Sequence, residues 1–279
     1  MTAVDPAFRF PTRQDRKSLP VARPWHLRHA AWLPFLVPGL ILVLWEIGSH
    51  VGLISTQILP RPSAVLVKAW DLALTGELFL HLGVSTLRAL GGLAIGGTLG
   101  FALGLANGLS ARSALLTDTS VQMVRNIPIL ALIPLVIIWF GVGETARLFL
   151  VSISVFFPIY INTFHGVRNV DPQLIEMGRA YGMSRRSLFG KVIFPGALPS
   201  IFVGLRYALG LMWFVLVVAE TLAAKAGLGY MAMQAREFMM LDVVVLSILL
   251  YALLGKLADV VTRALEVRAL AWNPAYARH

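Results

Sequence analysis

Six ionisable side chains lie within or at the ends of long apolar runs of the sequence: Glu46, Arg88, Arg206, Glu220, Lys256 and Asp259. Ionisable groups are costly in hydrocarbon, so each is a candidate for function. Most stand near the ends of the runs, where their charged groups reach the membrane interface. Lys256 and Asp259 are three positions apart and are spaced to pair on one helix face. We therefore expect mainly structural roles for this set.

The sequence shows no spacing typical of enzyme chemistry. His26 and His29 lack acidic or cysteine companions, and cysteine is absent from the chain, so no metal site is expected. Neither Gly-Lys pair, at positions 190 and 255, is followed by Ser or Thr, so the phosphate-binding loop is missing. We expect no catalytic residue, no metal and no cofactor in this chain. Any ATP must be used by another chain.

The elements that carry these side chains are predicted to be membrane-spanning helices. The 279 residues are 57% hydrophobic and 14% charged, whereas about 25% charged residues is usual for soluble domains. Crossing the bilayer takes about 20 mostly apolar residues in a helix. The sequence therefore predicts an all-α polytopic membrane protein with about six spans, at 31–49, 84–108, 121–141, 147–166, 198–221 and 242–263.

Lysine and arginine positions predict the orientation of these spans. With the N-terminus in the cytoplasm, most of these cations fall on the inner side, which is the usual bias. Residues 1–30 then form a basic cytoplasmic tail without a cleavable signal peptide, residues 31–275 form the transmembrane domain, and both termini are cytoplasmic. The net charge of +10 is explained by topology and contact with anionic lipid.

Five glycines recur at every fourth position of the second predicted span: Gly92, Gly96, Gly100, Gly104 and Gly108. They form a groove about 24 Å long on one helix face at 1.5 Å per residue. Small residues let helices approach closely in lipid, so helix packing is the expected role. A sliding surface between moving helices is the alternative.

Pro128 and Pro134 fall inside the third predicted span. Each proline removes a backbone hydrogen bond and favours a kink. Broken helices occur at membrane depth where they line a cavity or pack on protein. The two prolines therefore predict either a pore-lining segment or an ordinary kinked helix.

A polar segment at about 168–197 separates the fourth and fifth spans. Asp171 can cap a helix that begins at Pro172, Gly182 can end that helix, and Ser184 can cap the next one. Its cations are Arg168, Arg179, Arg185, Arg186 and Lys191. A DNA-binding helix pair has similar features, but this unit is tethered at both ends to membrane spans. We expect no nucleic-acid partner.

The segment resembles the cytoplasmic signature of binding-protein-dependent ABC importer permeases, which reads E-A-A, three residues, G, nine residues, I-x-L-P. Glu176 and Gly182 stand at the acidic and glycine positions of that motif. Its last positions are filled by Val192, Phe194 and Pro195. Met177 and Gly178 replace the two alanines. The resemblance implies a cytoplasmic coupling helix that docks on an ATPase subunit.

The residues that the resemblance assigns to ATPase coupling are Glu176, Met177, Gly178, Ala180, Tyr181, Gly182, Met183, Ser184 and Pro195. Among them Ala180, Tyr181 and Met183 offer a compact apolar contact, and Glu176 with the basic residues can fix its register. Pro195 would pass movement of the loop to the fifth span.

Stretches beyond this loop, including GALPSIFVGLRYALGLMWFVLVVAET and the ending WNPAY, resemble aliphatic sulfonate permeases of the nitrate, sulfonate and taurine group. The resemblance covers roughly 31–275. It implies a type I ABC importer-like permease in the bacterial inner membrane. The implied partners are a second, identical permease copy, two ATPase subunits that bind ATP and Mg, and a periplasmic substrate-binding protein.

The implied function is import of aliphatic sulfonates, alkanesulfonates in particular. Taurine, nitrate, bicarbonate or a vitamin precursor is an alternative cargo for the same kind of importer. An ATP-independent secondary transporter is a third hypothesis, although its expected inverted repeat is not convincing here. The sequence assigns no substrate-contacting residue.

Overall fold

The computed structural model describes residues 33–222 and 224–273, and every regular element in these ranges is a helix. The predicted all-α fold is therefore confirmed for the described chain. The predicted tail over 1–30, with His26 and His29, lies outside the described residues, as do the last residues of the predicted transmembrane domain. The chain divides into two compact units, Met1–Ile54 and Ser55–His279, which are described separately.

The first unit contains one described helix, α1 (Leu33–His50), which matches the predicted first span. The helix is apolar along most of its length and has Pro38 inside it. Glu46 and His50 are four positions apart and lie 3.1 Å apart, so the carboxylate of this span has a partner on its own helix.

The second unit is a bundle built on four long helices, α3 (Glu77–Leu109), α6 (Glu144–Arg168), α9 (Phe194–Thr221) and α11 (Leu241–Ala269). Each is long and apolar enough to cross a membrane. The shorter helices are α2 (Pro62–Thr75), α4 (Ala111–Arg125), α5 (Ile133–Phe140), α7 (Pro172–Ala180), α8 (Arg185–Leu188) and α10 (Leu228–Glu237).

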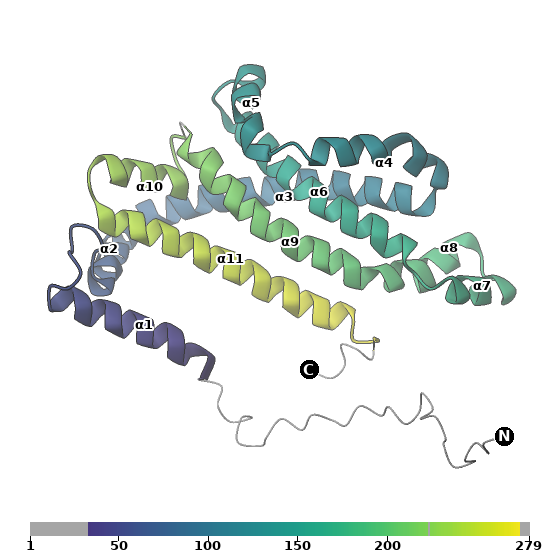
Figure 1. Cartoon of the computed structure of the whole chain (residues 1–279), viewed down its shortest axis with the longest axis horizontal. Helices are drawn as coiled ribbons and strands as arrows, with labels where there is room; N and C mark the ends of the chain where they lie inside the picture. Colours follow the sequence, from purple (N-terminus) through teal and green to yellow (C-terminus); the bar gives the residue numbers. More distant parts are fainter. Residues whose placement is uncertain (1–32, 223, 274–279) are drawn as a thin grey trace, which may run out of the picture. The chain divides into compact units, whose positions relative to one another are not determined.

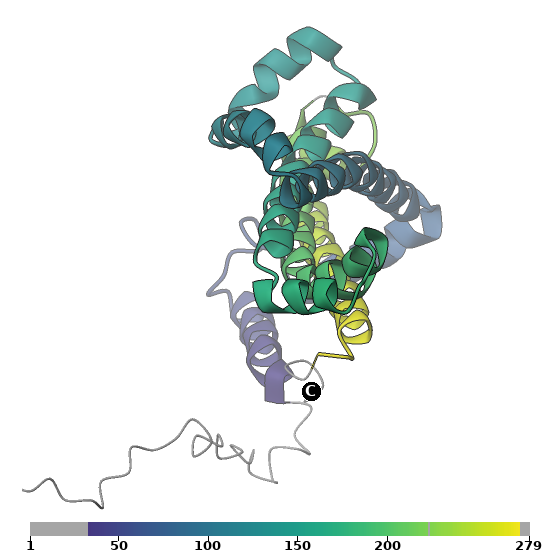
Figure 2. The same ribbon diagram turned by 90° about the vertical axis from the view of Figure 1, so that its right-hand side faces the viewer.

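The core of this unit forms where α3, α6 and α9 pack together (Figure 1). Its buried side chains are Ala89, Val151, Val155, Ile159, Ala208, Met212, Trp213 and Leu216. Helix α11 packs beside α9, as the view along the bundle in Figure 2 shows. Many large apolar side chains on the outer faces of these helices are exposed, as expected for surfaces that face lipid.

The third predicted span is not one kinked helix but two separate helical segments. Helix α4 ends at Arg125, and the following 3-10 helix (Ile129–Leu132) and α5 are bent from it by 86°. Pro128 has extended backbone and precedes the 3-10 helix, while Pro134 lies in the first turn of α5. Proline disfavours helix in the residue before it and is tolerated in a first turn, so these prolines mark helix starts.

The bent pair also decides the number of spans. The described residues contain four helices long enough to cross, and five spans if the bent pair counts as one. Helix α1 is a further, shorter apolar helix. The predicted number of about six is reached only when both the bent pair and α1 are counted.

Candidate functional site

The segment between α6 and α9 folds as the sequence predicts. The Asp171 carboxylate accepts a hydrogen bond from the Gln173 N–H at 2.9 Å, and Pro172 begins α7. The Ser184 hydroxyl accepts one from the Ser187 N–H at 3.3 Å at the start of α8. The predicted caps are confirmed, and they make this segment a defined helical pair.

Gly182 ends α7 with a left-handed backbone, φ +73°. The N–H of Met183 donates to the carbonyl of Gly178 at 3.0 Å, and the N–H of Gly182 donates to the carbonyl of Arg179 at 2.9 Å. This is the Schellman arrangement, in which the positive-φ residue lets the chain turn sharply. A side chain at position 182 would strain that turn.

One face of α7 is packed and another is exposed and apolar. Gly178 is buried, and a methyl group on it would lie 2.7 Å from a terminal carbon of Leu188. Position 178 therefore fixes α7 against α8. The exposed apolar side chains are Leu174, Met177 and Tyr181, the last 83% exposed. Their spacing places them along one side of the helix.

The remaining residues assigned to coupling lie around this face. Glu176 and Ala180 are exposed on α7, and Met183 is half-buried after the turn. Helix α8 continues through a π-helical turn, Phe189–Ile193, into α9, with Pro195 in the first turn of α9. This continuous helical path over 185–221 connects the exposed α7 face to a membrane-crossing helix.

The five glycines of α3 all face α6. A methyl group added at any of them would lie within 2.8 Å of an α6 heavy atom. At Gly96 and Gly100 the nearest atoms are the backbone oxygens of Ser152 and Phe156, at 2.0 and 2.5 Å. The two helix backbones are thus in direct contact, which only glycine permits along this column.

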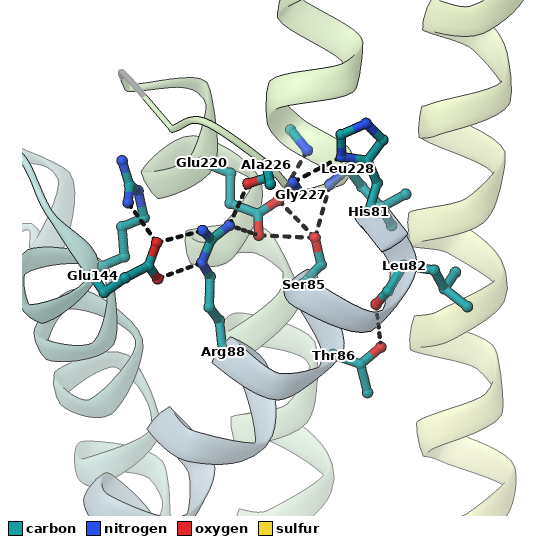
Figure 3. A network of polar contacts seen from close by, with 12 residues as sticks. His81, Leu82, Ser85, Thr86, Arg88, Glu144, Glu220, Ala226, Gly227 and Leu228 are labelled. Carbon is teal, nitrogen blue, oxygen red and sulfur yellow. Dashed lines mark hydrogen bonds and ion pairs between the residues drawn. The ribbon is translucent and has the colours of Figure 1, made fainter. Parts of the chain in front are cut away.

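A network of polar side chains lies where α6 begins and α9 ends (Figure 3). At its centre is Glu220, which is fully buried. Its carboxylate accepts hydrogen bonds from the Ser85 hydroxyl at 2.8 Å, an Arg88 guanidinium N–H at 2.8 Å, the Gly229 backbone N–H at 2.9 Å and the Tyr251 hydroxyl at 2.8 Å. A buried carboxylate with this many donors is well compensated.

Arg88 connects Glu220 to a second carboxylate, Glu144, at the first position of α6 (Figure 3). Two nitrogens of the Arg88 guanidinium donate to the two oxygens of Glu144 at 2.6 and 2.5 Å. Arg147 also donates to Glu144, at 2.9 Å. The Arg88 and Arg147 side chains are both 7% exposed, whereas that of Glu144 is 58% exposed.

The loop before α10 closes over this ion pair. The carbonyl of Ala226 accepts a hydrogen bond from Arg88 at 2.6 Å, and the N–H of Gly227 donates to His81 at 3.1 Å. Gly227 has φ +119°, and a methyl group on it would lie 2.5 Å from Glu220 and 2.6 Å from Arg88. Glycine at this position therefore lets the backbone reach the charges.

A second polar cluster joins α3, α4 and α6. The Tyr160 hydroxyl donates to Asp118 at 2.7 Å and accepts from the Asn107 amide at 2.7 Å. Asn107 also bonds Ser113 and Thr117 of α4. Tyr160 and Asn107 are both fully buried. This cluster holds the otherwise polar α4 against the bundle.

Sequence reasoning singled out Arg88 and Glu220 but did not pair them. It missed Ser85, Glu144 and Tyr251, whose partners lie far away in the sequence. The available signal was weak, namely polar residues near the ends of apolar runs. In contrast, the expected Lys256–Asp259 pair is confirmed at 3.3 Å, and Arg206 adds ion pairs to Asp259 and Glu266 on α11.

Comparison with known proteins identifies the family. Residues 96–270 match the family described as binding-protein-dependent transport system inner membrane component, and the chain belongs to it. One relative is the aliphatic sulfonates transport permease SsuC of Escherichia coli (strain K12). It is 58% identical to this chain, and the alignment covers 90% of this chain and 95% of the SsuC chain. The SsuC permease of Bacillus subtilis (strain 168) is 40% identical over 91% and 92%.

The taurine transport system permease TauC of Escherichia coli (strain K12) is 35% identical over 89% of this chain and 92% of its own. Among solved structures, the MetNI methionine ABC transporter in an inward-facing conformation matches 68% of this chain and 95% of its own, with 22% identity and a TM-score of 0.49.

The family and the helices together define a multi-pass permease subunit of an ABC importer, rather than an enzyme. Membership implies that an ATPase and a substrate-binding protein work with it. The features described above therefore belong to a transport machine whose chemical energy comes from another subunit.

Proposed function

We propose that this chain is the permease subunit of an ATP-driven importer of aliphatic sulfonates in a bacterial inner membrane. The observation that carries the proposal is the 58% identity to the SsuC permease over 90% of the chain. Taurine and nitrate permeases are also relatives, at 35% and 32% identity, and they keep these cargoes, with bicarbonate or a vitamin precursor, as alternatives. Family membership favours ATP-driven import over the secondary-transporter hypothesis.

The proposed assembly has two copies of this permease, two ATPase subunits that hold ATP and Mg, and one periplasmic binding protein. Both termini of the permease lie in the cytoplasm, and so does segment 168–197. The excess of Lys and Arg on the cytoplasmic side supports this orientation. It also places the Glu220 network toward the periplasmic ends of the helices.

In this assembly the α7 face docks on the ATPase. Leu174, Met177 and Tyr181 provide apolar contact area that is exposed in the chain by itself. Closure of the ATPase pair around ATP would push α7, and the continuous path through α8 and Pro195 would transmit the push to α9. Pro128 and Pro134 belong to the bent pair, whose broken backbone is consistent with a pore-lining position. A sliding α3–α6 contact along the glycine column remains a hypothesis.

Growth on alkanesulfonates tests the cargo. A strain without the gene should lose growth on ethanesulfonate or butanesulfonate as sole sulfur source, keep growth on sulfate, and recover with a plasmid copy. Unchanged growth of the deletion strain, with loss on taurine or on nitrate as nitrogen source, would move the proposal to that alternative cargo.

Docking of the ATPase is tested with Tyr181→Ala combined with Met177→Ser. These changes remove apolar area from side chains that are 83% and 49% exposed, so the permease should fold but co-purify with less ATPase. Arg112→Gln is the control, because Arg112 is exposed on α4 and lies outside segment 168–197. Equal recovery of ATPase with the wild type, the double variant and the control would rule out this face as the docking site.

A further inference from the structure

Glu144 occupies a position that is built for an anion. The carboxylate lies at the first turn of α6, whose N-cap Gly143 contributes no side-chain cap. Arg88 and Arg147, both nearly buried, point their donors at it. Helix N-termini and buried guanidinium groups both favour negative charge. The carboxylate itself is 58% exposed, so water reaches it while its two cations stay enclosed.

The two carboxylates of the network differ in this respect. Glu220 is enclosed by donors from three helices, α3, α10 and α11, and its release would leave a buried charge. Glu144 can turn outward and remain hydrated. An external oxyanion could therefore take its place at a modest cost, while Glu220 continues to balance Arg88.

An apolar cavity adjoins this position. It has a volume of about 210 Å³ and is bounded by side chains of α5, α6 and α9, including Ile137, Ala146, Leu150 and Ala219, and by Val142 in the loop between α5 and α6. Gly143 and Arg147 also line it. Arg147 is thus shared by the ion-pair network and the cavity. At about 30 Å³ of liquid volume per water molecule, the space equals about seven waters and suits a short alkyl chain.

We propose that Arg88 and Arg147 form an anion subsite of the permease, and that the sulfonate group of the cargo binds there by displacing Glu144. The alkyl chain of the cargo then lies in the adjoining cavity. This inference rests on the proposed function, and it names the first residues of the permease that contact the substrate. Because the sulfonate only replaces the Glu144 carboxylate on the two arginines, the net affinity for the cargo stays low. A low affinity suits a site that must release its cargo.

Glu144→Gln tests the displacement step. The purified permease–ATPase complex, without binding protein and in low-chloride buffer, is titrated with ethanesulfonate by calorimetry. Removal of the competing charge should tighten binding by about tenfold. Adding Arg147→Gln to Glu144→Gln should reverse the gain. The matched control is Glu77→Gln, an exposed first-turn carboxylate of α3, which should leave the affinity unchanged.

Chain length tests the cavity independently. Wild-type affinity should rise from methanesulfonate to butanesulfonate and then level off as the cavity fills. Val142→Phe should reduce the affinity for butanesulfonate more than for methanesulfonate, because position 142 is exposed at the cavity wall. Ile138→Phe, at an exposed position of α5 that does not line the cavity, should have no such effect.

The outcomes separate this subsite from the proposed function. Transport of ethanesulfonate by the intact importer, with unchanged affinity in Glu144→Gln or no chain-length dependence, overturns the subsite alone. Absence of any sulfonate transport by the wild-type importer overturns the proposed function. If Glu144→Gln does not assemble, the Val142→Phe comparison decides.

Discussion

Substitution of Gly96 by alanine should separate the two central helices of the bundle. The added methyl group would lie 2.0 Å from the Ser152 carbonyl oxygen, and contacts below 3.0 Å require movement. Because the obstacle is backbone, α3 and α6 must separate by about 1 Å. A gap of that size forfeits a quarter to a half of each dispersion contact across the interface. Overpacking of this kind costs about 2 kcal/mol.

The matched control is Gly97→Ala at the next position. There the added methyl group meets only side-chain carbons, the nearest at 3.4 Å, so it fits without movement. Both changes raise helix propensity equally, by about 1 kcal/mol, so the difference between them isolates the clash. We expect the Gly96→Ala midpoint to lie about 4–8 °C below that of Gly97→Ala.

The assay is thermal denaturation in mild detergent, followed as loss of the monodisperse peak in size-exclusion chromatography. Gly92→Ala provides an internal check, since its closest obstacle is a side-chain methyl of Val151 at 2.3 Å. Val151→Ala should therefore partly rescue Gly92→Ala, whereas no change of the Ser152 side chain should rescue Gly96→Ala. Equal midpoints for Gly96→Ala and Gly97→Ala would refute the close-contact argument.

Three further predictions concern the polar network, the α7 turn and the α4 cluster. Glu220→Ala removes the partner of buried donors and should lower stability by about 3 kcal/mol, measured as the same thermal midpoint. Gly182→Ala forces a side chain into a left-handed turn at a cost of about 1 kcal/mol. In proteoliposomes that contain the whole importer, it should reduce the ATP hydrolysis by the partner ATPase that accompanies transport. Tyr160→Phe removes the Tyr160 donor from Asp118, which keeps only Gln122 at 3.3 Å, and should cost about 1–2 kcal/mol, again measured as the thermal midpoint.

Each of these changes has a control in the chain. Glu77→Ala removes an exposed first-turn carboxylate of α3 and should cost less than about 1 kcal/mol, so a loss equal to that of Glu220→Ala would contradict burial as the cause. Gly190→Ala adds a methyl group in open space at ordinary φ, and equal ATPase loss there would discount the turn. Tyr207→Phe alters an exposed hydroxyl, and an equal loss would show that the Tyr160 bonds contribute nothing.

Local features were predictable from the sequence because their causes lie within a few residues. Asp171, Gly182 and Ser184 act on backbone groups two to five positions away, so their roles in ending and starting helices follow from residue type. The four-residue glycine spacing likewise predicts a groove on α3. It does not say which helix fills that groove.

The errors arose where the chain turns through irregular backbone. The apolar run over 121–141 is long enough for one span, and composition does not distinguish a kinked helix from two helices at 86°. That choice depends on how α4 and α5 pack against α3 and α6. The polar cluster around Tyr160, which holds α4, is made by residues up to 53 positions apart.

By itself the sequence determined that the chain is helical and membrane-embedded, where most spans run, and that α7 and α8 form a capped pair with the importer signature. These features depend on hydrophobicity and on short-range hydrogen bonds. Only the tertiary structure decided that α6 fills the glycine groove, that Arg88 joins Glu220 to Glu144, and that Arg147 borders a cavity. Those contacts depend on which helices lie side by side and at what register, and no local pattern of residues specifies that.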